Sequence, residues 1–246
     1  MDRMLYVAMT GAAQTLNAQA ANSHNLANAA TPGFKADLHQ FRSMPVLGEG
    51  LPSRVYALGE RPGVDHRVGA LQTTGRELDV AVEGDGWIAV QAPDGSEAYT
   101  KRGDLQVSVN GVVTDGAGHP VMGDGGPIAL PPFEKLDVGS DGTVSLRMVG
   151  QDATSLAAVE RIKLVKVDPS RLEKGEDGLF HLRGGGEEGA DASVRLVPGS
   201  LEASNVNAVD ALVQMISLAR QFELQVKMME TAKSNDAAAN QAMRIA

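Results

Sequence analysis

The sequence of 246 residues contains no cysteine and few aromatic side chains. Without cysteine it can form neither a disulfide framework nor a thiolate metal site. Aromatic residues make up only 4% of the chain, which is low for an enzyme that encloses a substrate in a buried pocket. The length is still sufficient for one large domain or two modest ones, each with a hydrophobic core.

Long apolar runs and an excess of positive charge are also missing. No stretch of about 18 consecutive apolar residues occurs, so we expect no membrane span. Residues 1–16 lack a basic segment followed by a continuous apolar run, so we expect no ordinary cleaved signal peptide. The formal net charge of -9 argues against binding nucleic acid, because the phosphates would be repelled.

Motifs that carry catalysis or hold a ligand are absent too. The histidines are dispersed, with no pair four residues apart. Gly84-Asp85-Gly86 precedes a predicted strand instead of opening a helix, which excludes the dinucleotide-binding geometry. Gly184-Gly185-Gly186 lacks the Lys-Ser/Thr pair of a phosphate loop, and the aspartates at turns lack calcium-loop spacing. We therefore expect no enzymatic activity, no catalytic residue, no cofactor and no metal ion.

Residues 1–34 are predicted to form a long helix followed by a turn. Apolar side chains recur at spacings of three and four, as on one face of a helix. This stripe consists of Leu5, Met9, Ala12 and Leu16, and it continues through the polar Gln19 and Ser23 to Leu26. Pro32 pushes Thr31 out of the α region, and Gly33 allows the turn. A helix of about 26 residues would be roughly 39 Å long, so it needs a partner along its length.

Residues 202–246 are predicted to supply that partner. Asn207 suits a helix N-cap, and Asp210 is the acid favoured in the first turn. A second stripe follows, made of Val209, Leu212, Ile216, Ala219, Phe222, Val226 and Met229. The pattern alone also fits an ordinary core helix. Because both chain ends carry a stripe, we expect the two helices to pair along a shared seam as a coiled coil.

Between the two helices the periodicity changes. Residues 35–77 are interrupted by proline and glycine, so we expect an irregular connecting arm with short strands. Residues 78–201 alternate apolar and polar side chains, which predicts an antiparallel all-β domain. Its turns are predicted at Asp94-Gly95, Asn110-Gly111, Asp115-Gly116, Asp141-Gly142 and Asp177-Gly178. The predicted fold class is mixed α and β, with this domain inserted between two long terminal helices.

Several motifs resemble those of the bacterial flagellar rod and hook proteins. Asn25-Leu26-Ala27-Asn28, followed by Thr31-x-Gly33-Phe34, is similar to the family's N-terminal signature, and its Ala30–Phe34 ending is similar to the proximal-rod type. Leu78–Trp87 and Tyr99–Leu105 resemble the core of the family's β domain. Leu201–Val206 resembles the motif that leads into the C-terminal helix, and Arg220, Phe222 and Glu223 match the C-terminal signature.

The resemblance implies a structural subunit of the proximal rod of the flagellar basal body. It implies export by the flagellar secretion apparatus without a cleaved signal, a place in the periplasm-spanning rod, and contacts with copies of itself and with proximal- and distal-rod proteins. The assembly interface would comprise both stripes together with Asn25, Asn28, Thr31, Gly33, Phe34, Asn205, Arg220 and Glu223. The alternatives are a distal-rod or hook subunit, or a periplasmic β-domain enzyme or carbohydrate-binding protein.

Overall fold

A computed structural model describes residues 3–45, 55–148, 150 and 156–245. The chain divides into two compact units. The first, called here the helical unit, comprises Met1–Ala29, Ala36–Asp65 and Val206–Ala246. The second, called the β unit, comprises Ala30–Lys35 and His66–Asn205. The segment expected as a connecting arm, residues 35–77, is therefore divided between the two units.

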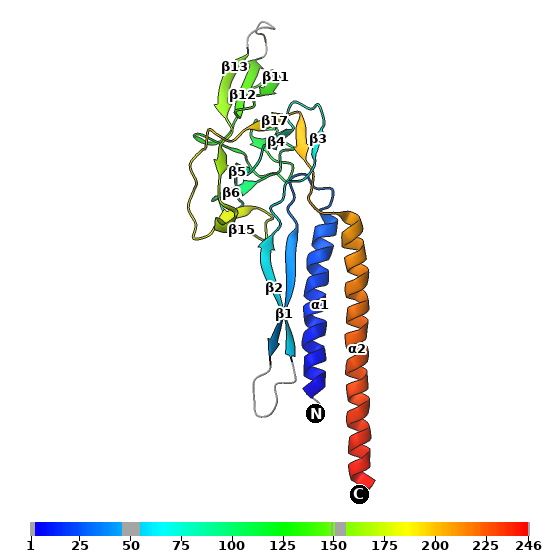
Figure 1. The fold of residues 1–246 in the computed structure, drawn as a ribbon. Coiled ribbons are helices and arrows are strands. Elements are labelled where there is room, and N and C mark those ends of the chain that lie inside the picture. The colour runs from blue at the N-terminus through cyan, green and yellow to red at the C-terminus, as the bar shows by residue number, and fades with distance from the viewer. Residues whose placement is uncertain (1–2, 46–54, 149, 151–155, 246) are drawn as a thin grey trace. The chain divides into compact units, whose positions relative to one another are not determined.

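Two long helices form most of the helical unit. α1 spans Arg3–Ala27 and α2 spans Ala208–Ile245. Figure 1 shows them side by side, and they run antiparallel because the side chain of Asn22, near the end of α1, bonds to Ala211, near the start of α2. The prediction of a long helix at each end of the chain is confirmed.

Local side-chain chemistry defines the ends of these helices. Asn207 Oδ1 accepts hydrogen bonds from the backbone nitrogens of Val209 at 3.0 Å and Asp210 at 3.4 Å, which confirms the predicted N-cap of α2. At the end of α1, the side-chain amide of Asn28 donates to the carbonyl of His24 at 3.0 Å. The backbone nitrogen of Asn28 donates to the same carbonyl at 3.2 Å, so Asn28 closes the last turn of α1 with two bonds.

A long β-hairpin packs beside α1 (Figure 1). β1 (Asp37–Pro45) and β2 (Val55–Val64) pair antiparallel, with one irregularity in register early in β1. These strands are longer than the short, irregular ones expected for this segment. Both strands of a two-stranded sheet have a free edge, and an edge tolerates proline. The prolines and glycines of this segment therefore punctuate the sequence without ending the strands.

The β unit contains one five-stranded sheet, one three-stranded sheet and several short strand pairs, all antiparallel. In spatial order the five-stranded sheet contains β14 (Leu164–Lys166), β5 (Gly86–Gln91), β6 (Glu97–Thr100), β16 (Phe180–Leu182) and β15 (Leu172–Lys174). The three-stranded sheet contains β11 (Phe133–Val138), β12 (Thr143–Met148) and β13 (Ala157–Arg161). The pairs are β4 (Val80–Val82) with β17 (Leu196–Pro198), β3 (Leu71–Thr73) with β18 (Ser200–Glu202), β7 (Gln106–Val107) with β8 (Val113–Thr114), and β9 (Met122–Gly123) with β10 (Gly126–Pro127).

One apolar core joins these sheets, and its members are almost fully buried. It includes Val80, Val82, Ile88, Val90, Leu105, Val121, Ile128, Leu146, Ile162 and Leu196. The described residues of the β unit form no α-helix, only one 3₁₀ turn at Pro169–Arg171. The antiparallel β region predicted between the helices is therefore confirmed.

Glycines at positive φ make four of the five predicted turns. Gly95, Gly111, Gly142 and Gly178 all have φ between +80° and +87°. The exception is Asp115-Gly116, where the prediction is wrong: the positive φ falls two residues later, at Gly118. The reason is that the Asp115 carboxylate accepts bonds from the backbone nitrogens of Ala117 and His119, which moves the tight point of the turn forward.

Candidate assembly surface on the terminal helices

The face that α1 turns toward α2 carries mostly small side chains. Asn22 Nδ2 donates to the Ala211 carbonyl at 2.7 Å, and a Cβ on Gly11 would lie 2.5 Å from Gln225 Oε1. The buried residues of α1 recur at alternating spacings of three and four, so they share one face. They are Ala8, Gly11, Thr15, Ala18 and Asn22, with Ala12 beside them. We call this face, together with the face of α2 that meets it, the inner seam.

The predicted stripes coincide with this seam only in part. Ala12 is buried and Leu5, Leu26, Ala219, Phe222, Val226 and Met229 are half-buried, as expected. Met9 and Leu16 of α1 are 50% and 48% exposed, however, and Val209, Leu212 and Ile216 of α2 are 67%, 49% and 56% exposed. The expectation that these side chains lie in the seam within one chain is therefore wrong. A spacing of three and four fits the small-residue face equally well, and closely packed helices place small side chains between them.

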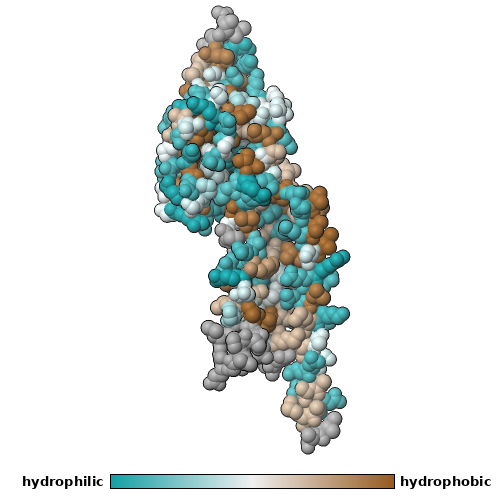
Figure 2. Space-filling model, viewed as in Figure 1, coloured by the Kyte–Doolittle hydropathy of each residue, from teal (hydrophilic) through white to brown (hydrophobic). Residues whose placement is uncertain are grey.

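A second apolar face of α2 points away from α1 and stays exposed. It consists of Val209, Leu212, Val213, Ile216 and Leu224, which we call the outer stripe. Ala211, whose carbonyl bonds to α1, lies on the opposite side of the helix. Figure 2 shows hydrophobic side chains along the edge of the first half of α2. Arg220 lies between Ile216 and Leu224 on this face, and the four apolar side chains before it form an exposed apolar patch of the kind that marks an interaction surface.

The asparagines of the N-terminal signature bond within their own chain. The side-chain amide of Asn25 donates to the Asp37 carbonyl and accepts from the Asp37 nitrogen, both at 2.8 Å. His24 Nδ1 lies 2.9 Å from Asp37 Oδ2. These bonds join the end of α1 to the start of β1, while Asn22 joins α1 to α2. The amides that sequence analysis placed at a contact between subunits therefore fix the arrangement of the helical unit.

The rest of the signature lies in the β unit. Gly33 has φ +67°, is buried, and donates its N–H to the Glu202 carbonyl at 2.7 Å. The Asn205 nitrogen donates to the Phe34 carbonyl at 3.3 Å, and Lys174 Nζ lies 4.0 Å from the centroid of the Phe34 ring. The segments that precede β1 and follow β18 are thus bound together on the β unit.

A buried charged cluster of Lys35, Glu202 and Lys101 holds these two segments. Lys35 Nζ lies 2.6 Å from Glu202 Oε1, and their side chains are 1% and 0% exposed. The Gly69 nitrogen donates to the same carboxylate oxygen at 2.9 Å, and Lys35 Nζ also donates to the Arg67 carbonyl at 2.8 Å. Lys101 Nζ lies 3.9 Å from Glu202 Oε2. Buried charges are tolerated where they are paired and hydrogen-bonded in this way.

Burial lowers the pKa of Lys101 to about 8, since it outweighs the favourable effect of the Glu202 carboxylate. The neighbouring Lys35 lowers the pKa further, and Asp85 raises it. Lys101 also donates to the Gly84 carbonyl and lies 5.5 Å from the centroid of the Trp87 ring. Moderately alkaline pH therefore removes the charge of Lys101 from the folded protein.

This shift predicts a pH effect on stability. Between pH 8 and 10.5 the unfolded chain keeps the Lys101 proton while the folded β unit has lost it, so the free energy of unfolding rises with pH in this range. The expected rise is roughly 3 kcal/mol relative to Lys101→Met, which has no such proton. Urea unfolding followed by the fluorescence of Trp87, the single tryptophan, measures it.

The comparison with Lys101→Met also removes the effect of a second group. Burial raises the pKa of Tyr99, so its ionisation in the unfolded chain lowers stability above pH 10 in both proteins. If the free energies of unfolding of the two proteins run parallel from pH 8 to 10.5, the lowered pKa of Lys101 is wrong.

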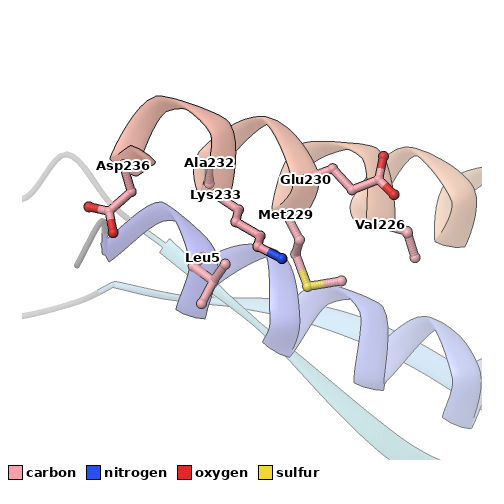
Figure 3. Close-up of a pocket in the computed structure, with 7 residues that line it drawn as sticks. All are labelled: Leu5, Val226, Met229, Glu230, Ala232, Lys233 and Asp236. Carbon is pink, nitrogen blue, oxygen red and sulfur yellow. The ribbon is translucent and has the colours of Figure 1, made fainter. Parts of the chain in front are cut away.

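An apolar groove lies between the first turns of α1 and the second half of α2. Its volume is about 380 Å³, and its floor consists of Leu5, Val226, Met229 and Ala232. Figure 3 shows Leu5 from α1 and Met229 and Lys233 from α2 extending into the space between the helices. Glu230 and Asp236 complete the rim.

Known flagellar proteins match this chain over nearly its whole length. Three family models match separate segments of it. Residues 5–35 match the family model described as Flagella basal body rod protein, and residues 197–242 match Flagellar basal body rod FlgEFG protein C-terminal. Residues 81–146 match Flagellar hook protein FlgE/F/G D1 domain. The chain is 45% identical to the flagellar basal-body rod protein FlgF of Escherichia coli K12 over 247 residues, which cover 98% of each chain. The chain belongs to the flagellar basal-body rod protein family.

The chain is also similar to other members of this family. FlgF of Salmonella typhimurium LT2 is 44% identical, with 98% of each chain covered. FlgG of Buchnera aphidicola subsp. Schizaphis graminum is 31% identical over 255 residues, covering 93% of this chain and 95% of that protein. The chain is thus a structural component of the flagellar rod and not an enzyme, as the sequence motifs implied.

Among the described residues, no helix is both long enough and apolar enough to cross a membrane. Within the same residues, no group of three or more histidine, aspartate or glutamate side chains is arranged to hold a metal ion. The outer stripe and the groove are apolar surfaces of this rod protein that a partner can contact.

Proposed function

We propose that this chain is a subunit of the proximal rod, and that its terminal helices pair as a coiled coil and pack against those of neighbouring subunits to form a tube. The spacing of the inner seam supports the coiled coil. Buried positions of α1 alternate in steps of three and four, and the less exposed positions of α2 from Ala211 to Asp236 do the same. This is the heptad pattern of knobs-into-holes packing.

The outer stripe is the observation that best supports the proposed assembly. Its side chains are apolar, face away from α1 and are each about half or more exposed in their own chain. Burying one such side chain contributes about 1.5–3 kcal/mol, so several of them at one contact outweigh the surface ion pairs around them. A helix with apolar side chains on its inner and outer faces is suited to being enclosed on all sides, as it would be inside a tube.

The partners follow from this arrangement. An outer stripe that meets a different surface of the next subunit makes a heterologous contact, which propagates instead of closing a dimer. The neighbours would be copies of this chain and other proximal- and distal-rod proteins. The 45% and 44% identity to FlgF of Escherichia coli and Salmonella typhimurium, against 31% to FlgG of Buchnera aphidicola subsp. Schizaphis graminum, supports the proximal position. Delivery would be through the flagellar export apparatus, without a cleaved signal, to the periplasm-spanning rod.

Replacing Ile216 with aspartate tests the proposal. The side chain is more than half exposed in the subunit, so Ile216→Asp should leave both units folded and the protein exported. In the assembled rod it would bury an unpaired carboxylate, which costs several kcal/mol and prevents packing. We expect cells that depend on this variant to form no rod beyond it and not to swim. Soft-agar motility and electron microscopy of basal bodies measure the outcome.

Gln214→Asp is the matched control, because Gln214 is exposed and lies on the side of α2 opposite Ile216, outside the outer stripe. This variant adds the same charge and should keep motility. Equal motility of the two variants, or loss of the thermal unfolding transition in Ile216→Asp alone, would show that the outer stripe is not the assembly surface.

A further inference from the structure

Two short segments of the β unit connect it to the long helices. Residues 30–35, called here the N-segment, follow α1 in the chain, and residues 202–205, the C-segment, precede α2. α1 and α2 run antiparallel, so pulling their outer ends apart separates them one turn at a time. Tension applied to the two ends of the chain therefore passes to the N-segment and the C-segment.

The N-segment and the C-segment are bound to each other. The Gly33 nitrogen donates to the Glu202 carbonyl at 2.7 Å. The Asn205 nitrogen donates to the Phe34 carbonyl at 3.3 Å. Lys35 Nζ lies 2.6 Å from Glu202 Oε1, and both side chains are buried. We call this contact between the two segments the clasp.

The direction of the two segments suits the clasp to resist tension. Gly33 bonds to Glu202, and the next residue of the N-segment bonds to a later residue of the C-segment, so both segments run the same way. The chain leaves toward α1 from the low-numbered end of one and toward α2 from the high-numbered end of the other. Pulling from these opposite ends slides one segment along the other, which loads both hydrogen bonds and the ion pair at the same time.

Lys174 fastens the N-segment to the five-stranded sheet as well. Its Nζ donates to the Lys35 carbonyl at 2.9 Å and lies 4.0 Å from the centroid of the Phe34 ring. A charged donor makes a stronger hydrogen bond than a neutral one, and a cation over an aromatic face adds further attraction. The N-segment is therefore held by β15 in addition to the C-segment.

The first and last strands of the β unit have the opposite geometry. β3 pairs antiparallel with β18, with Leu71 opposite Glu202. β4 pairs antiparallel with β17, with Val80 opposite Pro198. In each pair the chain enters and leaves at the same end. Tension on these pairs would open them from that end, one hydrogen bond after another, which takes little force.

We infer that the clasp is a mechanical device, which carries tension between the two ends of the chain and keeps it away from the sheets of the β unit. The hairpin of β1 and β2 is protected as well, because it lies between the two segments along the chain. Since the clasp is formed within one chain, it acts whichever surface assembles the rod, and it goes beyond the proposed function.

Stretching single molecules of the full chain in an optical trap tests the clasp. Handles are attached through one cysteine added at each end, because the chain has no cysteine of its own. After the helices separate, we expect a single step at higher force that releases about 600 Å, the extended length of the 167 positions from Lys35 to Glu202. Smaller steps before that release would show that the sheets bear the tension, contrary to the inference.

Lys174→Met weakens the clasp without leaving a buried charge. We expect it to shorten the lifetime of the clasped state under constant force about tenfold, the effect of losing one bond from a charged donor. Lys166→Met is the matched control, because Lys166 is exposed on β14, the opposite edge strand of the same sheet. The control should keep the lifetime of the unchanged protein. Equal lifetimes for the two variants would overturn the inference.

A variant of the apolar core separates resistance to force from stability in urea. Leu146 on β12 is fully buried and lies outside both segments. Leu146→Ala should lower the urea midpoint of the β unit clearly, yet leave the lifetime under force within about twofold, because the clasp breaks before the core is loaded. Lifetimes that fall in step with the urea midpoint would mean that the core, and not the clasp, resists the tension.

Discussion

Replacing Glu202 with glutamine is expected to lower the free energy of unfolding of the β unit by about 3–5 kcal/mol. The substitution leaves Lys35 and Lys101 as buried ammonium groups without a carboxylate. It also weakens the bond from the Gly69 nitrogen, because an amide oxygen is a poorer acceptor than a carboxylate. A domain of this size is stable by only about 5–15 kcal/mol, so the loss should be visible as a large shift of the urea midpoint.

The fluorescence of buried Trp87 reports on the unfolding of this unit. Glu77→Gln is the matched control, since Glu77 pairs with Lys135 at 3.6 Å on the surface, where both side chains are about half exposed. That variant should cost less than about 1 kcal/mol. The double variant Lys35→Met/Glu202→Gln should lose less than the sum of the two single variants, because each single change leaves the other charge buried. Additive losses would mean that the ion pair does not act as a unit.

Sequence periodicity located the elements of this protein but not the faces that meet. The two helices, the cap at Asn207 and four of the five turns follow from local chemistry, which the sequence displays directly. The sequence does not show which face of each helix forms the inner seam. Ala8, Gly11 and Ala18 add little to a hydrophobic pattern, whereas Met9 and Leu16 dominate it, so the large exposed side chains were assigned to the contact that the small ones make.

Local sequence patterns could not predict the contacts between distant segments. Lys35 and Glu202 are separated by 167 positions, and in the sequence each is an ordinary charged residue. The alternation of β18, which turns Ser200 and Glu202 to the buried side, is a local signal that this carboxylate is internal. Similarly, sequence analysis singled out Asn25 as part of a signature. Its partner, the backbone of Asp37, became apparent only once α1 and β1 were placed together.

The long hairpin was missed for a different reason. Proline and glycine disfavour strands inside a sheet, so the sequence of residues 35–77 predicts interruptions. In the structure β1 and β2 form a sheet of two strands, where each strand has a free edge and those residues are tolerated. A pattern of residues cannot indicate whether a strand is central or at an edge, since that depends on which segments pair.

Replacing Gly33 with alanine is expected to destabilise the β unit by more than about 4 kcal/mol. Gly33 has φ +67°, a region that costs a residue with a Cβ roughly 1–2 kcal/mol. A Cβ there would also collide with the carbonyl group of Lys101 and lie 2.5 Å from the backbone nitrogen of Arg102. Backbone atoms cannot rotate aside, so residues 30–35 would have to leave the β unit, breaking the bond from Gly33 to the Glu202 carbonyl and displacing Lys35 from its carboxylate.

Gly75→Ala separates the two causes of this loss. Gly75 has nearly the same conformation, with φ +72°, but a Cβ there would meet no atom within 4 Å. Its substitution should therefore cost only the roughly 1–2 kcal/mol of the unfavourable φ. Urea unfolding followed by Trp87 fluorescence compares the two variants, and the excess loss in Gly33→Ala measures how tightly the N-terminal signature is bound to the β unit. Equal losses would mean that this segment can move away from Lys101 at little cost, and that the charged cluster, not Gly33, holds it in place.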